Sequence, residues 1–212
     1  MTLTEFRKEY TMSGLRRRDL AADPFTQFQK WFNEAVEAQV PEPTAMTLAT
    51  ADKSGQPSAR TVLLKSFDER GFIFCTNYLS QKGLELENNP HACMVFFWKE
   101  LERQVAIRGT VTKVPRAESE LYFQARPVGS RLGAWVSQQS TPVSDRAFLE
   151  EKFREMEQKF PGENVPCPEY WGGYVLAPIT IEFWQGRVNR LHDRFRFTKQ
   201  TDKMWLTERL SP

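Results

Sequence analysis

Short strand-like segments joined by tight turns begin at residue 45 and restrict the folds open to this chain. "AMTLATA" and "SARTVLLKSF" flank the turn "DKSGQP", and further strand-like runs continue to "KMWLTERL" near the C-terminus. Strands joined by short turns pair antiparallel, whereas a parallel sheet needs a crossover, usually a helix, between successive strands. The sequence therefore predicts about eight antiparallel strands that close into a barrel.

Helical segments are inserted among these strands without regular alternation. The first has Asp23 as its N-cap and Pro24 at its first position, and apolar residues recur from Phe25 to Val36 at helical spacing. Further helices are expected at 80–90, with Ser80 as the N-cap, and at 116–125, 130–137 and 144–160. Gly109 is expected to form a bulge or bend within a long strand. We predict a mainly β fold with peripheral helices, in which an N-terminal arm of residues 1–22 precedes one domain of residues 23–212.

Composition and charge exclude several classes of protein. The 29 basic and 27 acidic residues leave a net charge of +2, whereas a general nucleic-acid binder would have a strong basic excess. No run approaches the roughly 18 apolar residues of a membrane span, and the polar N-terminus does not resemble a signal peptide. Cys75, Cys93 and Cys167 lack the spacing of a disulfide framework or a zinc site. We expect a cytoplasmic protein that binds neither nucleic acid nor membranes and holds no metal.

The segment "NRLHDRFRF" carries basic side chains at alternate positions, namely Arg190, His192, Arg194 and Arg196. In an extended strand these four would share one face, with Leu191 and Phe195 on the other. The alternation alone fits a solvated strand face as well as an anion-binding site.

Familiar catalytic motifs are missing from the sequence. It contains no nucleophile elbow, phosphate-binding loop, dinucleotide-binding glycine motif or zinc-protease motif, and His91 and His192 are its only histidines. A protein with so few nucleophiles and bases either performs no chemistry or uses the chemistry of a cofactor.

Possible phosphate-binding side chains are spread over several predicted elements. They are Arg60 and Lys65 in one strand, Lys82 at a helix N-terminus, Tyr122, Arg126 and Ser130 around a helix end at Pro127, and Gln139 and Ser140 in a polar loop. Each alone is more often a surface ion pair or a helix cap. Together with the basic alternation at 190–196, they suggest two phosphorylated ligands. Strict alternation would nevertheless put Arg60 and Lys65 on opposite faces of their strand.

Several motifs in the same order resemble those of the pyridoxamine 5′-phosphate oxidase family. They are "RTVLLK", "FCTN", "SQKGLELENNP", "LERQV", "YFQARPVGSRLGAWVSQQS", "YWGGY" and "IEFWQGRVNRLHDRFRF". The resemblance covers nearly the whole chain. It implies a homodimeric split β-barrel that holds FMN at the subunit interface. The implied reaction oxidises pyridoxamine or pyridoxine 5′-phosphate to pyridoxal 5′-phosphate in vitamin B6 salvage, with O2 as acceptor and release of H2O2, and of ammonia from the amine.

The resemblance also implies the residues of the site. FMN would be held by Arg60, Thr61, Val62, Leu63, Leu64, Lys65, Cys75, Thr76, Gln81, Lys82, Gln104, Gln139, Ser140, Trp184 and Arg194. The substrate would meet Arg7, Lys8, Glu9, Tyr10, Lys65, Tyr122, Arg126, Ser130, Arg190, Leu191 and His192. Arg190 and His192 are the expected catalytic residues, and residues 7–10 match a segment that closes over the substrate in this family.

Two positions depart from the family pattern, because Gln81 and Lys8 stand where arginine is frequent. Gln81 removes one cationic contact with a phosphate, which would weaken FMN binding. Two alternatives to the oxidase are another FMN-dependent split-barrel reductase and a carrier that binds pyridoxal phosphate without turnover. In addition, the cluster Arg16, Arg17 and Arg18 is either a solvated arm or a second site for the anionic product.

Overall fold

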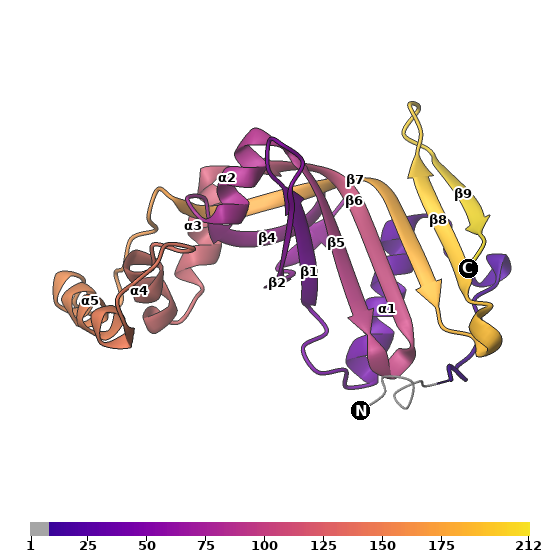
Figure 1. Cartoon of the computed structure of the whole chain (residues 1–212), viewed down its shortest axis with the longest axis horizontal. Coiled ribbons are helices and arrows are strands. Elements are labelled where there is room, and N and C mark those ends of the chain that lie inside the picture. Colours follow the sequence, from indigo (N-terminus) through magenta and orange to yellow (C-terminus); the bar gives the residue numbers. More distant parts are fainter. Residues whose placement is uncertain (1–8) are drawn as a thin grey trace.

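The computed structural model describes residues 9–212, and these form one curled antiparallel sheet with helices packed around it (Figure 1). The strands are β1 (Ala45–Ala51), β2 (Pro57–Leu63), β3 (Ser66–Asp68), β4 (Gly71–Asn77), β5 (His91–Trp98), β6 (Arg103–Lys113), β7 (Trp171–Gln185), β8 (Asp193–Lys199) and β9 (Trp205–Leu210). The helices are α1 (Pro24–Glu37), α2 (Gln81–Asn88), α3 (Arg116–Gln124), α4 (Val128–Val136) and α5 (Arg146–Lys159). The predicted split-barrel fold is confirmed.

The long strand β7 divides the sheet into two parts. The main order is β2-β1-β5-β6-β7-β4-β3, with β8 and β9 added outside it. The first half of β7 pairs with β4 and its second half pairs with β8, while β6 runs along both halves on the other edge. The register of β6 against β7 shifts between Arg108 and Gly109, as the sequence predicted for Gly109. A Cβ at Gly109 would lie 2.0 Å from the carbonyl oxygen of Ala177, so only glycine fits this close approach.

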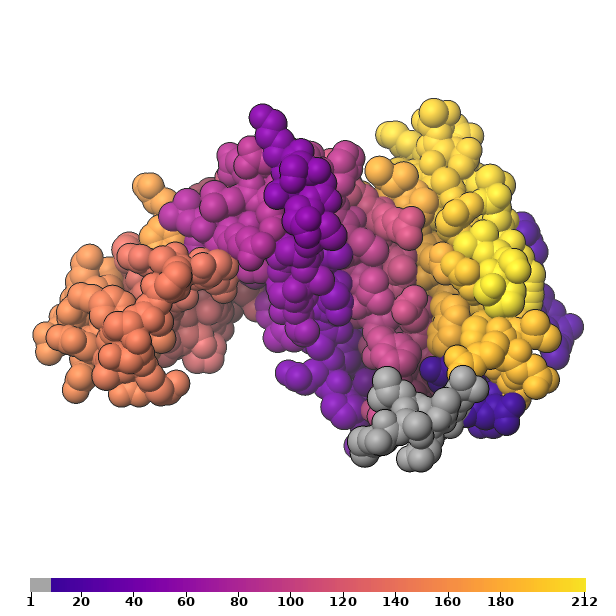
Figure 2. Space-filling view, in the orientation of Figure 1, coloured from indigo at the N-terminus to yellow at the C-terminus, as the bar shows by residue number. Residues whose placement is uncertain are grey.

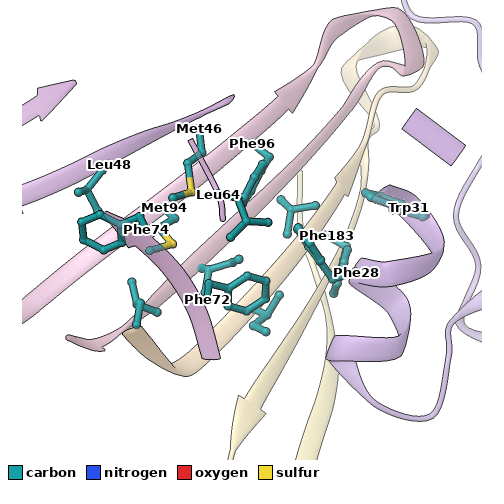
Figure 3. Close-up of a cluster of buried hydrophobic side chains, with 14 of the residues drawn as sticks. Phe28, Trp31, Met46, Leu48, Leu64, Phe72, Phe74, Met94, Phe96 and Phe183 are labelled. Carbon is teal, nitrogen blue, oxygen red and sulfur yellow. The ribbon is translucent and has the colours of Figure 1, made fainter. Parts of the chain in front are cut away.

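Helix α1 covers the main core. Phe28 and Trp31 of α1 are buried, and Phe28 lies edge-on to Phe72 and Phe96 of the sheet (Figure 3). Asp23 caps the helix by accepting hydrogen bonds from the backbone N–H groups of Phe25 and Thr26, as predicted. The apolar face is rotated slightly from the expected one, because Val36 is exposed while Trp31 packs inside.

Helices α3 to α5 form a lobe beside the strands, drawn in pink to orange in Figures 1 and 2. The lobe has its own small core, in which Phe123 and Leu132 pack with Val165 and Trp171. Trp171 is also the first residue of β7, so the lobe is attached directly to the sheet. This junction borders the candidate site.

The N-terminal residues 9–22 run along the sheet before α1. Leu15 is buried in the main core, and its backbone N–H donates to Asp193 (3.0 Å). Arg16, Arg17 and Arg18 are exposed around a 3-10 turn, and the guanidinium of Arg17 donates to the carbonyl of Thr207 (3.0 Å). A second product site at these arginines stays a prediction. Within residues 9–212, no helix is long and apolar enough to cross a membrane.

Candidate active site

A cavity of about 830 Å³ lies where β2, β4 and α2 meet the helical lobe. Most of the predicted site residues line it. They are Arg60, Thr61, Val62, Leu63, Lys65, Cys75, Thr76, Gln81, Lys82, Tyr122, Arg126, Ser130, Gln139 and Ser140. Leu64 is the exception within its motif, because its side chain is buried in the main core. The cavity brings together segments from residue 58 to residue 171.

Arg60 and Lys65 both reach this cavity because the strand expected to contain them is interrupted. "SARTVLLKSF" is not one strand, since β2 ends at Leu63 and β3 begins at Ser66. Lys65 lies in the break, where its backbone N–H donates to Ile73 of β4 (2.8 Å). Strict alternation therefore ends before Lys65, and the expected conflict between the two faces does not arise.

Lys82 is a buried cation at the start of α2. Ser80 caps this helix as predicted, and the Lys82 side chain is 7% exposed. Its ammonium donates to the side-chain oxygens of Gln139 (2.8 Å) and Thr76 (3.1 Å). Burial and the nearby charge of Arg60 lower the pKa of Lys82 to about 8. Lys82 is therefore mostly charged at neutral pH, and its positive end sits beside the helix N-terminus, where anions are favoured.

Arg60 is held by polar groups that sequence reasoning missed. Its guanidinium forms an ion pair with Glu85 of α2 (3.3 Å) and donates to the hydroxyls of Thr50 and Ser58. Thr50 and Ser58 also donate to Glu85. Arg60 and Lys82, with Gln139 and Thr76, form what we call the Arg60–Lys82 group.

A second set of cations lines the cavity next to the lobe. The ammonium of Lys65 lies 5.7 Å from the ring of Tyr122, and the guanidinium of Arg126 lies 4.7 Å from the ring of Trp171. Arg126 lies between α3 and α4, so the helix is interrupted at Pro127 as the sequence predicted. We call this set the Lys65–Arg126 group.

Arg126 has an unused donor. Its Nη1 atom is buried and has no hydrogen-bond partner among the described residues. Burial lowers the pKa of Arg126, which nevertheless stays charged because guanidinium groups do not deprotonate in proteins. A buried donor without a partner is costly, and an anion in the cavity would satisfy it.

Cys75 forms part of the cavity wall between these groups. Burial raises the pKa of its thiol to about 12, although the charges of Lys65 and Arg126 act in the opposite direction. The thiol therefore stays protonated at neutral pH, which makes it a weak nucleophile. Cys75 contributes shape here and no covalent chemistry.

Six other predicted residues lie outside this cavity, toward β8 at the other side of the sheet (Figure 1), namely Gln104, Trp184, Arg190, Leu191, His192 and Arg194. Gln104, Trp184 and Arg194 are register partners on β6, β7 and β8, so they form one row across three strands. Arg194 is fixed in this row by Glu182, which accepts from its Nε atom (2.8 Å). We call this row, with residues 190–192, the C-terminal cluster.

The predicted four-residue basic face at 190–196 is wrong. Strand β8 begins only at Asp193, and Val188–Arg190 is a 3-10 turn in which Asn189 and Arg190 have φ angles of 56° and 61°. Arg190 and His192 therefore precede the strand, while Arg194 and Arg196 share its outer face. Arg196 pairs with Glu208 (3.0 Å) and Arg194 with Glu182 (2.8 Å), so each of these arginines already has a carboxylate partner.

The neutral ring of His192 is held in one tautomer. The backbone N–H of Arg187 donates to its Nδ1 atom (3.1 Å), so the proton of the neutral ring is on Nε2. Burial, and then the charge of Arg190, lower the pKa of His192 and keep the ring neutral at pH 7. Tyr10 and Trp184 flank the ring at centroid distances of 5.7 and 4.7 Å. Arg7 and Lys8 of the expected substrate set lie outside the described residues, and Glu9 is exposed.

Comparison with known proteins decides the family. Residues 32–160 match the family model of pyridoxamine 5′-phosphate oxidase, and residues 171–212 match that of the pyridoxine 5′-phosphate oxidase C-terminal dimerisation region. The chain belongs to the pyridoxamine 5′-phosphate oxidase family.

Relatives of the family match over the full chain. A pyridoxine/pyridoxamine 5′-phosphate oxidase of Crocosphaera subtropica is 55% identical over 214 residues, covering 100% of both chains. One of Paraburkholderia phymatum is 55% identical, covering 100% of this chain and 99% of its own. Among solved structures, PhzG from Burkholderia lata in complex with tetrahydrophenazine-1-carboxylic acid has a TM-score of 0.88 at 32% identity, covering 95% of this chain and 99% of its own.

FMN is the cofactor of the pyridoxamine 5′-phosphate oxidase family, and the cavity fits it. The Arg60–Lys82 group offers charged donors for a phosphate, and β2 supplies small and apolar side chains between the two cationic groups. The uncommitted Nη1 atom of Arg126 leaves a donor for a second anion. Among residues 9–212, no three His, Cys, Asp or Glu side chains are grouped as metal ligands would be.

The protein is a homodimer, because residues 171–212 are the dimerisation region of this family. This region contains Trp184, Arg190, His192 and Arg194. The cavity and the C-terminal cluster of one chain are separate groups of residues.

Proposed function

We propose that the cavity oxidises pyridoxamine and pyridoxine 5′-phosphate to pyridoxal 5′-phosphate, with FMN bound and O2 as the final acceptor. The products are H2O2 and, from the amine, ammonia. The observation that carries the proposal is one cavity with two cationic groups, since cofactor and substrate each bring a phosphate. Members of the family that match the whole chain carry the name of this oxidase.

We assign the two cationic groups to different phosphates. The Arg60–Lys82 group binds the phosphate of FMN, and residues 61–65 with Cys75, Gln81 and Ser140 complete the cofactor wall. The Lys65–Arg126 group, with Tyr122 and Ser130, binds the phosphate of the substrate. The unsatisfied donor of Arg126 supports this assignment, because a substrate phosphate would give it the partner that the chain does not.

We assign the C-terminal cluster to the cavity of the partner subunit. Gln104, Trp184 and Arg194 would contact FMN there, while Arg190, Leu191 and His192 would contact the substrate. Each of the two sites of the dimer then contains residues of both chains. This arrangement accounts for a cluster of ligand-binding side chains that lies away from the cavity of its own chain.

Bound FMN would supply the hydride acceptor for oxidation at C4′ of the substrate, with O2 as the final acceptor of the electrons. The residues of the chain need no nucleophile for this step. Their task is to hold the two rings together and to exclude competing reactions, while one water molecule is needed to release ammonia from the oxidised amine. The fixed Nε2–H of His192 donates a hydrogen bond toward the substrate, and Arg190 provides a charged contact beside it.

Two further assignments concern the chain as a whole. We propose that residues 1–22 form an arm that closes over the substrate, with Arg7, Lys8, Glu9 and Tyr10 facing it, and that residues 23–212 form the split-barrel domain. Tyr10 already contacts the rings of Trp184 and His192. We also propose a cytoplasmic location, which the free thiols of Cys75, Cys93 and Cys167 favour.

The test is the flavin content of the purified protein, followed by peroxide release on addition of pyridoxamine 5′-phosphate. We expect yellow protein, anaerobic bleaching of its flavin by substrate, and one peroxide for each pyridoxal phosphate in air. Bleaching without peroxide release would indicate a reductase with another acceptor. Colourless protein that binds pyridoxal phosphate but cannot be reconstituted with FMN would indicate a carrier.

A further inference from the structure

Glu85 is a buried carboxylate directly behind the cavity wall. It is 7% exposed and does not line the cavity, but two residues that do, Arg60 and Gln81, bond to it. The Arg60 guanidinium lies 3.3 Å from its Oε2 atom, and the side-chain amide of Gln81 donates to its Oε1 atom (2.8 Å). A buried carboxylate beside a phosphate site is unexpected, because like charges repel.

The carboxylate is ionised. Burial alone would raise the pKa of Glu85, but hydrogen bonds from Ser58, Thr50 and Gln81 and the charge of Arg60 outweigh this and lower it. With Arg60 and Lys82 charged, the Arg60–Lys82 group and Glu85 together carry one net positive charge. A phosphate group carries roughly 1.5 to 2 negative charges at pH 7, so the net charge of Arg60, Lys82 and Glu85 does not neutralise it.

We propose that Glu85 is the resident counterion of Arg60: it positions the guanidinium before the cofactor binds and then competes with the cofactor phosphate for it. This inference rests on the assignment of Arg60 to the FMN phosphate. Glu85 is a positioning residue, since it acts through Arg60 and Gln81 and not on the ligand. Its effect is to weaken the binding of FMN relative to a flavin that lacks the phosphate.

Gln81 strengthens the case. An arginine at position 81 would supply a second cation within reach of Glu85, one helical turn away. In this chain the neutral amide of Gln81 bonds to Glu85 without offsetting its charge. Arg60 is therefore the one cation that pairs with Glu85 among the described residues, and phosphate and carboxylate share it.

The experiment compares FMN with riboflavin, which differs only in lacking the phosphate. Apoprotein is titrated with each flavin, and binding is followed by quenching of flavin fluorescence. In Glu85→Gln the amide keeps hydrogen-bonding capacity toward Thr50 and Ser58 but loses the charge. We expect FMN to bind about three- to tenfold more tightly than in the unsubstituted protein, with riboflavin unchanged, because a nearby like charge is removed.

Thermal unfolding gives a second readout. Removing one partner of a buried ion pair leaves the other charge uncompensated, so the Glu85→Gln apoprotein should melt at a lower temperature. FMN then supplies the missing negative charge, and the rise in Tm that it causes should be larger than in the unsubstituted protein.

Two variants act as controls. Glu87→Gln removes the same charge from an exposed position on the same helix, where Glu87 lies 3.5 Å from the ammonium of Lys113, and should leave both flavins unaffected. Glu85→Asp keeps the charge and should keep the ratio of FMN to riboflavin affinity even if packing lowers both. An unchanged or smaller ratio in Glu85→Gln, or an equal loss for both flavins, overturns the inference. If the unsubstituted apoprotein binds no FMN, the proposed function itself fails.

Discussion

The cavity and the C-terminal cluster both carry arginines, but Arg126 of the cavity and Arg194 of the cluster are held in opposite ways. In the cavity, Arg126 is half-buried with an unsatisfied Nη1 atom and no carboxylate partner among the described residues. In the C-terminal cluster, Arg194 is paired with Glu182, and the neighbouring Arg209 donates to Asp193. A cation without a carboxylate partner is ready for an anionic ligand, whereas a paired cation mainly shapes the surface that presents its neighbours. Arg126 of the cavity is therefore available to an anion and Arg194 of the cluster is not, whereas Arg60 of the cavity is an intermediate case because Glu85 pairs with it.

The largest effect is expected in hybrid dimers, which test whether each site combines the cavity of one chain with the C-terminal cluster of the other. Arg126→Ala damages the cavity and Arg190→Ala damages the cluster, and each homodimer should lose about tenfold to a hundredfold or more in kcat/KM. If each site combines the cavity of one chain with the cluster of the other, a hybrid dimer has one intact site. Mixing the two variants in equal amounts should then restore about a quarter of the sites, because half of the dimers are hybrids and each hybrid has one intact site of two.

The matched control mixes two cavity variants, Arg126→Ala and Lys65→Ala. Every site of their hybrid dimers carries one defect, so no activity should return. Recovery in neither mixture would show that cavity and cluster of the same chain form the site. Recovery in both would show that Lys65 and Arg126 of one chain do not belong to the same site.

Substitution of Arg190 separates substrate contacts from cofactor contacts. Arg190→Ala removes a charged hydrogen-bonding group from the substrate, and we expect kcat/KM to fall about tenfold to a hundredfold while the FMN content stays normal. Anaerobic bleaching of the flavin by substrate measures the first effect, and the flavin absorbance of the purified variant measures the second. The variant could instead lose FMN and, once FMN is added back, have its flavin reduced by substrate at the normal rate. Arg190 would then contact the cofactor and not the substrate.

The pH dependence of FMN binding tests the charge of the cavity. The pKa of Lys82 is lowered to about 8, so its positive charge is present at pH 7 and is lost as the pH rises through 8. FMN affinity should therefore fall about tenfold between pH 7 and pH 9, in proportion to the charged fraction of Lys82. Lys82→Met should bind FMN weakly at both pH values, with a flatter profile. If the FMN affinity of Lys82→Met falls equally between pH 7 and pH 9, the pH dependence comes from a group other than Lys82.

The smallest effect is expected for His192, whose ring is neutral and donates through Nε2. His192→Ala should lower kcat/KM by less than Arg190→Ala does, because hydride transfer needs no obligatory base. With the pKa of His192 already below its ordinary value, kcat/KM should not rise as the pH increases from 7 to 8. Nitrogen NMR of the labelled ring should find the proton on Nε2, and a proton on Nδ1 would contradict the Arg187 contact.

The motif residues of the cavity were predictable because they lie in short stretches whose order is characteristic. The caps at Asp23 and Ser80, the helix end at Pro127 and the bulge at Gly109 also followed from local rules. The failures came where backbone geometry changes within a motif. The interruption after β2 brings Lys65 to the same cavity as Arg60, and the turn before β8 removes Arg190 and His192 from the strand.

The sequence by itself determined the antiparallel strands and indicated two phosphorylated ligands, because hydrophobic period, turn residues and side-chain chemistry are local properties. Only the tertiary structure decided which charges are available to a ligand. Glu85 and Arg60 are far apart in the sequence, and their pairing depends on how α2 packs against β1 and β2. The separation of the cavity from the C-terminal cluster likewise follows from the pairing of β7 with β4 along one half and with β8 along the other. Such contacts join residues distant in the chain, and no local pattern specifies them.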